Sequence, residues 1–268
     1  MKHVSTLTEH LRESVAEKNF ATLPFPLSYK ELCVAMEHFF EFLALPLESK
    51  QKFRLYIDPD DPESMVGYME RKQKKGDLDE KEYFHYNRYA EAGFADHVKT
   101  VGEKATRFLN SAARVYEGAE AEAKKIIFDL EKEYPGIRER FLPPGVHPHF
   151  YLRFLKYSVQ GKGNFLAGGH YDQGAFTLAL AESAPGLRIG LNQSKLQAVE
   201  HHDGHAVFMP GLQLHVFTSD EFIPAWHDVV QRGEDVLSDD AARWSMVFFV
   251  DPVRKVQTTW EERHKPKY

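Results

Sequence analysis

The stretch Gly168-Gly169-His170-Tyr171-Asp172-Gln173-Gly174-Ala175-Phe176-Thr177-Leu178 places a histidine and an aspartate two positions apart, just before an apolar run. Side chains alternate between the two faces of an extended strand, so His170 and Asp172 are expected to point to the same side. Two ligand atoms would then converge on one point. A capping or surface His-Asp pair is the plain alternative in a chain with 14 histidines. Whether the pair indicates a metal site therefore depends on the residues found in the rest of the chain.

Two later segments add to this pair. His227, in Ala225-Trp226-His227-Asp228, would complete a set of two histidines and one carboxylate. That set leaves coordination positions open and is typical of non-haem Fe(II) oxygenases. Arg243 and Ser245 begin an apolar strand and share one of its faces, where a guanidinium and a hydroxyl can hold a carboxylate. The alternatives are a core histidine at position 227 and a surface arginine at position 243.

Taken together, these residues resemble the isopenicillin-N-synthase-like family of Fe(II)/2-oxoglutarate-dependent oxygenases. In that family H-x-D and a distal histidine bind iron, and R-x-S binds the distal carboxylate of 2-oxoglutarate. Gly174 and Thr177 fall where the family's H-T-D-x-G-x-L-T has them, and residues 185–189 resemble its G-G-L-Q-V strand. Residues 211–227 align without a gap on the stretch that leads to the distal histidine. The likeness covers roughly residues 35–255.

The resemblance implies a fold that is mainly β with helical support, namely a double-stranded β-helix (jelly-roll) core with an α-rich N-terminal region. It implies Fe(II) and 2-oxoglutarate as cofactors and dioxygen as co-substrate. The implied reaction oxidises a C–H bond of a small molecule and releases succinate and carbon dioxide. The implied iron ligands are His170, Asp172 and His227. The implied 2-oxoglutarate contacts are Arg243, Ser245 and Tyr157.

Substrate contacts are less well marked in the sequence. Tyr68 and Tyr86 lie in stretches that resemble family segments near the mouth of the active site. Tyr151 and Arg153 are further candidates from their position alone: Tyr151 for a partly apolar pocket, and Arg153, with Arg88 as the alternative, for a substrate carboxylate. For Tyr68 and Tyr86, an ordinary packing role is the alternative.

The chain also departs from the family pattern. Leu155 stands where many relatives have an asparagine, Leu212 replaces the usual aspartate after Gly211, and the spacing from His227 to Arg243 is longer than usual. Residues 231–235 are expected to form a longer hairpin loop in that interval. Some relatives keep R-x-S without using 2-oxoglutarate. Two alternatives therefore stand: an Fe(II) oxidase of the same fold that needs no 2-oxoglutarate, and a non-catalytic metal- or ligand-binding jelly-roll protein.

Composition narrows the class of protein. The 268 residues are 43% hydrophobic and carry a net charge of −6, which gives no basic field for nucleic acid. Cys33 is the single cysteine, so no internal disulfide can form and a reducing compartment is favoured. No apolar leader or membrane-length segment is visible. We expect a cytoplasmic protein that acts on a small molecule, with neither nucleic acid nor membrane as a partner.

Local patterns predict the elements. Helices are expected over 6–17, from Ser28 to Leu45 and over 100–134, a short extended piece over 20–25, and loops over 56–81. Strand runs are expected at 150–157, 175–181, 186–191, 205–209, 213–218, 226–231 and 244–250. Residues 201–205, rich in histidine, are expected to form a solvated loop. The predicted division is an α-rich region over 1–145, a jelly-roll core over 146–255 that forms one compact unit with it, and a tail over 256–268.

Overall fold

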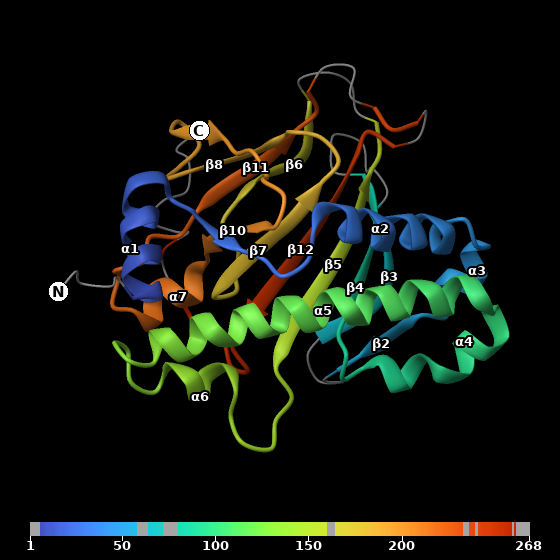
Figure 1. Ribbon diagram of the computed structural model, residues 1–268, viewed down its shortest axis with the longest axis horizontal. Coiled ribbons are helices and arrows are strands. Elements are labelled where there is room, and N and C mark those ends of the chain that lie inside the picture. The colour runs from blue at the N-terminus through green and yellow to red at the C-terminus, as the bar shows by residue number, and fades with distance from the viewer. Residues whose placement is uncertain are drawn as a thin grey trace.

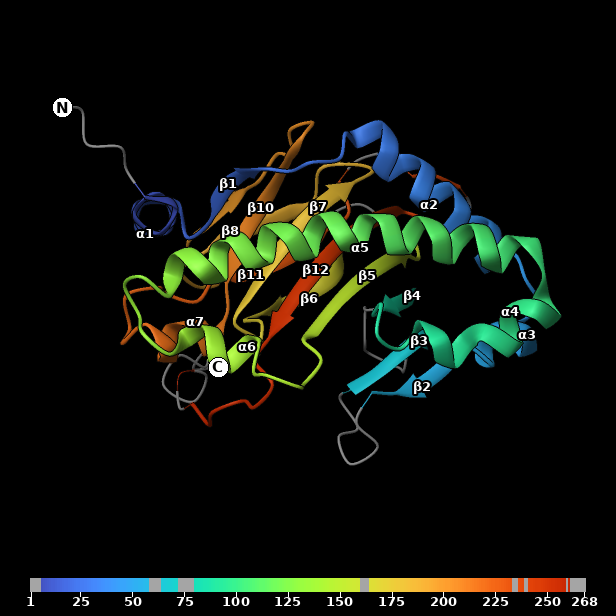
Figure 2. The same ribbon diagram turned by 60° about the horizontal axis from the view of Figure 1, so that its bottom comes forward.

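The computed structural model describes residues 6–57, 64–71, 80–159, 164–232, 236–238, 241–258 and 260. Within them, two antiparallel sheets form a double-stranded β-helix, and helices cover the larger sheet (Figures 1 and 2). The larger sheet has the order β1-β10-β7-β12-β5-β4-β3-β2, and the smaller has the order β6-β11-β8-β9. The predicted fold class is confirmed.

The strands of the larger sheet come from both sides of residue 145. They are β1 (Ala21–Pro24), β2 (Arg54–Tyr56), β3 (Met65–Arg71), β4 (Lys81–Tyr86), β5 (His149–Tyr157), β7 (Phe176–Glu182), β10 (His205–Pro210) and β12 (Arg243–Asp251). The smaller sheet consists of β6 (Phe165–His170), β8 (Leu187–Gly190), β9 (Leu196–Ala198) and β11 (Trp226–Val230). The α-rich N-terminal region thus contributes four strands to the sheet that also contains most of the core strands.

The expectation of loops over residues 56–81 is wrong where β3 and the start of β4 lie. Val66 and Tyr68 are fully buried in β3, and its charged neighbours at the strand's end obscure this apolar pattern in the sequence. Residues 58–63 and 72–79, including most of the basic run, lie outside the described part of the chain.

Helices form where the capping signals place them. In α1 (Leu7–Lys18) and α2 (Tyr29–Leu43), the Thr6 and Ser28 side chains accept from the backbone N–H of the third helical residue, a glutamate that returns the bond. The long α5 (Glu103–Leu130) buries one apolar stripe against α2, β5 and β12 (Figure 2). Shorter helices are α3 (Leu47–Gln51), η2 (Glu91–Phe94), α4 (Ala95–Val101), α6 (Ile137–Phe141) and α7 (Leu212–Phe217). None of the described helices is long and apolar enough to cross a membrane.

An aromatic core fixes α5 and α2 on the larger sheet. Phe108 of α5 is fully buried and lies 4.9 to 5.3 Å, centroid to centroid, from the rings of Phe39, Phe42, Phe84 and Phe154. Burying one such side chain stabilises the fold by roughly 1.5–3 kcal/mol. The sheet is thereby held as a rigid wall behind the space between the two sheets.

The other face of the larger sheet points into that space. In β12 the even-numbered Met246, Phe248 and Val250 belong to the helix-facing core, whereas Arg243, Ser245, Val247 and Phe249 line a pocket between the sheets. This is the alternation that a two-residue period dictates. The pocket therefore receives polar side chains from strands whose other face is anchored in the core.

Two strand predictions need correction. Residues 213–218 form part of helix α7 and its C-terminal end, not a strand. Leu212, Leu214 and Val216 alternate in sequence, but Thr218 donates to the Leu214 carbonyl and Gly211 starts a helical turn. The strands β6 and β9 were not anticipated as separate elements. The H-x-D pair also does not share a strand, because β6 ends at His170 and Asp172 lies in the connection to β7.

Candidate active site

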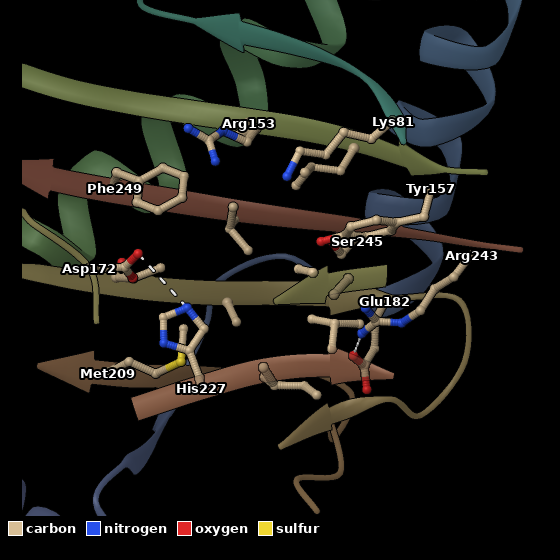
Figure 3. Close-up of a pocket in the computed structure, with 18 of the residues that line it drawn as sticks. Lys81, Arg153, Tyr157, Asp172, Glu182, Met209, His227, Arg243, Ser245 and Phe249 are labelled. Carbon is tan, nitrogen blue, oxygen red and sulfur yellow. Dashed lines mark hydrogen bonds and ion pairs between the residues drawn. The ribbon is translucent and has the colours of Figure 1, made fainter. Parts of the chain in front are cut away.

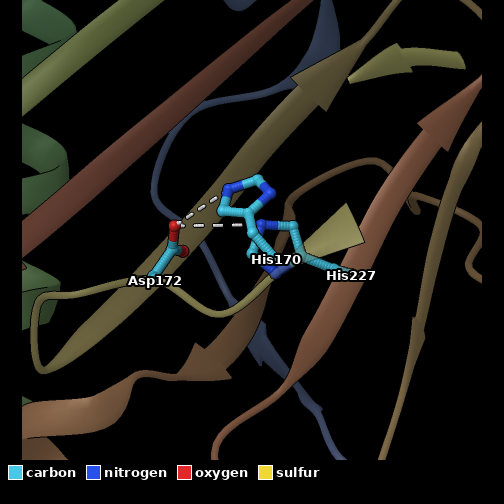
Figure 4. Close-up of side chains that lie close together, drawn as sticks. All are labelled: His170, Asp172 and His227. Atoms are coloured by element: carbon cyan, nitrogen blue, oxygen red, sulfur yellow. Dashed lines mark ion pairs between the residues drawn. The ribbon is translucent and has the colours of Figure 1, made fainter. Parts of the chain in front are cut away.

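Three predicted ligands meet at the end of the pocket between the sheets (Figure 4). One donor atom of each of His170, Asp172 and His227 lies within 4.8 Å of the others. The Oδ1 atom of Asp172 is 3.7 Å from His170 Nε2 and 3.8 Å from His227 Nε2. His170 and His227 are register partners in β6 and β11, so one sheet positions both imidazoles. It is the single group of this kind among the described residues that could hold a metal ion.

The surroundings orient each donor. The Nδ1 atoms of His170 and His227 are 2.8 Å and 3.2 Å from the carbonyls of Gly168 and Ala225. Each Nδ1 therefore carries the proton and donates, which leaves the Nε2 lone pair free. The Thr177 hydroxyl donates to Asp172 Oδ2 at 2.6 Å, so Oδ1 is the free oxygen. The remaining acceptors are two imidazole nitrogens and one carboxylate oxygen, the donor set suited to Fe(II).

The loop that carries Asp172 is tied to helix α7. The backbone N–H groups of Gly211, Leu212 and Gln213 donate to the carbonyls of Ala175, Asp172 and Gly174, respectively. A Cβ atom at Gly211 would lie 2.4 Å from the Gly174 oxygen. Only glycine allows this close approach, which accounts for its presence at the start of α7.

The pKa shifts favour the ligand-competent protonation states. Burial disfavours the charged form of Asp172, but His227, His170 and the Thr177 hydroxyl outweigh it and lower the pKa of Asp172. Desolvation and the neighbouring His227 lower the pKa of His170. An ionised carboxylate and a neutral imidazole are the forms that bind a metal. The His170 side chain is 50% exposed, against 12% for Asp172, so the metal centre opens to one side.

The pocket between the two sheets is named here the inner pocket (Figure 3). A second group of predicted residues, Arg243, Ser245 and Tyr157, forms its closed end. The hydroxyls of Ser245 and Tyr157 are 3.5 Å apart. Burial lowers the pKa of Arg243 to about 10, so the guanidinium stays charged at neutral pH. Its Nε donates to the Ala184 carbonyl at 2.8 Å, and its buried Nη1 has no partner in the described part of the structure. This orphaned donor, beside two hydroxyls, fits a ligand carboxylate.

Sequence reasoning missed two residues at this closed end. Glu182 forms a buried ion pair with Arg243 Nη2, and its other oxygen is 3.3 Å from His201 Nδ1 (Figure 3). A β-bulge explains why: Val247 pairs with Ala179 but Met246 pairs with Ala181, so β7 holds one extra residue. The bulge reverses which positions face the pocket, and Glu182 points inward. The predicted solvated loop over 201–205 is wrong for His201, whose side chain is 10% exposed and bonds the Ala179 carbonyl.

Beyond the metal centre lies a second hollow, named here the outer pocket, which is lined by His85, Tyr151, Arg153, His170, Tyr171, Asp172, Gln173, Gly174, Phe249, Asp251 and Lys255. The structure thus brings the predicted Tyr151 and Arg153 to the metal centre. It does not bring Tyr68 and Tyr86 there. Both are fully buried in the helix-facing core, where their hydroxyls donate to Glu82 and Glu91. In this structure the two tyrosines pack in the core, although their sequence segments resemble family segments near the mouth of the active site.

One family model matches part of the chain. Residues 130–252 match the model of the 2OG-Fe(II) oxygenase superfamily, a segment that contains all three clustered ligands and the R-x-S pair. The match covers less than half of the chain and identifies a domain of that superfamily within it. This domain, together with the donor set described above, indicates an oxidoreductase with Fe(II) and 2-oxoglutarate as cofactors. The narrower likeness to isopenicillin N synthase stays a prediction. A search of curated proteins found no match.

Solved structures share the fold. A full-length Neurospora crassa protein, in complex with alpha-KG and 5-formyluracil, has a TM-score of 0.69 at 20% identity over 92% of this chain and 78% of its own. The dioxygenase for auxin oxidation 1 of Arabidopsis thaliana has a TM-score of 0.70 at 14% identity, covering 97% and 95%. A putative oxygenase from Shewanella oneidensis has a TM-score of 0.66 at 19% identity, covering 94% and 88%. At these sequence identities the likeness shows a shared fold and nothing more.

Proposed function

We propose that this chain oxidises a C–H bond of a small organic molecule, consuming 2-oxoglutarate and dioxygen and releasing succinate and carbon dioxide. The convergence of His170, Asp172 and His227 supports the proposal, because it leaves the substrate-facing side of the metal centre open. Structural metal sites are normally closed by four protein ligands. This openness argues against a purely structural metal-binding protein.

The two ends of the inner pocket have separate tasks in this proposal. Fe(II) and 2-oxoglutarate, when bound, would supply the oxidising chemistry. The two imidazoles and the Asp172 carboxylate would hold the metal, while Arg243 Nη1 and the hydroxyls of Ser245 and Tyr157 would bind the distal carboxylate of the co-substrate. The pocket is also lined by apolar side chains, which would exclude water from it, among them Leu155, Leu187, Met209 and Val229.

The substrate is proposed to enter through the outer pocket. This pocket shares His170 and Asp172 with the inner pocket, so a molecule held there lies beside the metal centre. The similar Neurospora crassa protein has been solved in complex with thymine and with 5-formyluracil, both small molecules. Its low sequence identity to this chain leaves the substrate of this chain to experiment. We extend to this chain only the size class of the ligand.

The test is succinate formation from 2-oxoglutarate by the purified protein with Fe(II) in air, followed by NMR. Slow turnover is expected even without substrate, and it should vanish in His227→Ala and in Arg243→Ala. The ion pair between Glu182 and Arg243 favours one rival, since it partly neutralises the guanidinium. That rival is an Fe(II) oxidase of the same fold that needs no 2-oxoglutarate. Oxygen uptake that is independent of 2-oxoglutarate would replace the proposal with it.

A further inference from the structure

The outer pocket contains a cation that has no anionic partner among the described residues. Arg153 projects from β5 into the space between the sheets (Figure 3), where it lines both the inner and the outer pocket. Its one hydrogen bond in the described structure runs from Nε to His85 Nε2. No carboxylate in the described part of the chain forms a salt bridge with it. Partly buried arginines are normally paired, because desolvation of an unpaired guanidinium is costly.

Neighbouring groups fix the direction of the free donors. Burial and the nearby Arg153 lower the pKa of His85 well below its usual value, so the imidazole is neutral and accepts from Arg153 Nε. His85 Nδ1 faces the Met65 carbonyl at 3.4 Å. The Phe249 ring lies 4.4 Å from the guanidinium carbon and supports its plane. With Nε occupied and the plane supported, the two Nη groups remain for a ligand.

The carboxylates nearest to this guanidinium already have other tasks. Asp172 belongs to the metal centre. Asp251 pairs with Lys255, with 3.1 Å between Oδ2 and Nζ. Both carboxylates lower the cost of burying Arg153 without bonding to it. Once a metal ion neutralises Asp172, Arg153 becomes the uncompensated charge beside the reacting centre.

The geometry points to a substrate that is an organic carboxylate, held by Arg153 through its two free Nη groups, with an apolar body against Tyr151 and Phe249. This inference rests on the proposed function and names its substrate class. A planar carboxylate matches the guanidinium fork in shape and carries one charge.

The test uses matched probes that differ only in charge. Benzoate, phenylacetate and 3-phenylpropanoate, each with its primary amide, are titrated into the protein loaded with Fe(II) and 2-oxoglutarate under anaerobic conditions. Isothermal titration calorimetry then measures binding without turnover. At least one acid is expected to bind about ten times more tightly than its amide, since charge-assisted hydrogen bonds are stronger than those between neutral groups. Arg153→Gln should abolish that preference, and Arg153→Lys should keep part of it.

Controls separate the possible failures. Lys99→Gln removes an exposed cation that pairs with Asp96 and lines neither pocket, so it should leave the acid preference in place. Equal binding of acids and amides, absence of acid binding at millimolar concentration, or an acid preference retained in Arg153→Gln would each overturn the inference. Loss of 2-oxoglutarate binding in Arg153→Gln would also overturn it, by assigning the residue to the co-substrate. Failure of the proposed function looks different: the wild-type protein would then not bind 2-oxoglutarate, and the acid-amide comparison could still be read with Fe(II) alone.

Discussion

Glu182→Gln is expected to tighten 2-oxoglutarate binding. In the inner pocket the Arg243 guanidinium is already paired with Glu182, and a distal carboxylate bound at Nη1 would share the same cation. Two carboxylates on opposite edges of one guanidinium lie about 5 Å apart, which corresponds to about 3 kcal/mol of repulsion at an effective dielectric constant of about 20. The glutamine retains an oxygen that can accept from Nη2 and removes the charge.

The net gain should be smaller than the full repulsion, because the variant also loses the attraction that orders Arg243. We expect a dissociation constant for 2-oxoglutarate that is about ten to a hundred times lower, equal to about 1.4–2.8 kcal/mol. Anaerobic calorimetry with the Fe(II)-loaded protein measures it directly. The matched ligand is 2-oxobutanoate, which has the same chelating end but no distal carboxylate, and its affinity should not change.

Two results would refute this reasoning. Weaker 2-oxoglutarate binding in the variant would mean that the main effect of Glu182 is to hold Arg243 in place. An equal gain for 2-oxobutanoate would mean that the substitution acts elsewhere in the pocket.

Three further outcomes follow from the structure. Thr177→Val removes the 2.6 Å bond to Asp172 with little change of shape and should weaken Fe(II) binding about 10–100-fold in a metal titration. Phe108→Ala should lower the free energy of unfolding by about 3–5 kcal/mol in a denaturant titration, since the ring is fully buried among four others; a loss below about 1 kcal/mol would contradict that packing. The pKa of His85 is lower in the folded state than in the unfolded state, so the unfolded state binds the extra proton below about pH 6.5. The free energy of unfolding should therefore fall with acidification by at most about 1.4 kcal/mol per pH unit from this group, and His85→Gln should remove that part of the slope; an unchanged slope would exclude His85 as its source.

Local rules accounted for much of the fold. The capping boxes at Thr6 and Ser28 and the apolar stripe of α5 gave the helices in nearly their observed positions. The alternation of side chains along the sequence predicted the strands β5 and β12. In these elements, the spacing of the apolar residues along the sequence already marks the face that the fold buries. The alternation rule predicted the wrong element for residues 212–217. Alternating leucines also fit a short buried helix when a glycine and a threonine close its ends.

The candidate site, too, could be predicted only in part from the sequence. His170, Asp172 and His227 could be found because each belongs to a short motif, and the structure brings them together. The reasoning behind the pair was partly wrong, since Asp172 reaches its place through a loop held by α7 and not through strand alternation. Glu182 escaped prediction because a bulge in β7, invisible in the residue pattern, turns it inward. His85 and His201 act through contacts with strands distant in sequence, which no spacing rule encodes.

Binding of Fe(II) and 2-oxoglutarate at the two ends of the inner pocket can be followed by an anaerobic titration of the purified protein with Fe(II) and then 2-oxoglutarate, recorded in the visible spectrum. We expect a metal-to-ligand charge-transfer band that needs both additions and that is lost in His170→Ala and in Arg243→Ala. Iron binding without that band in the wild-type protein, or a band that survives Arg243→Ala unchanged, would contradict the assignment of the two ends of the inner pocket.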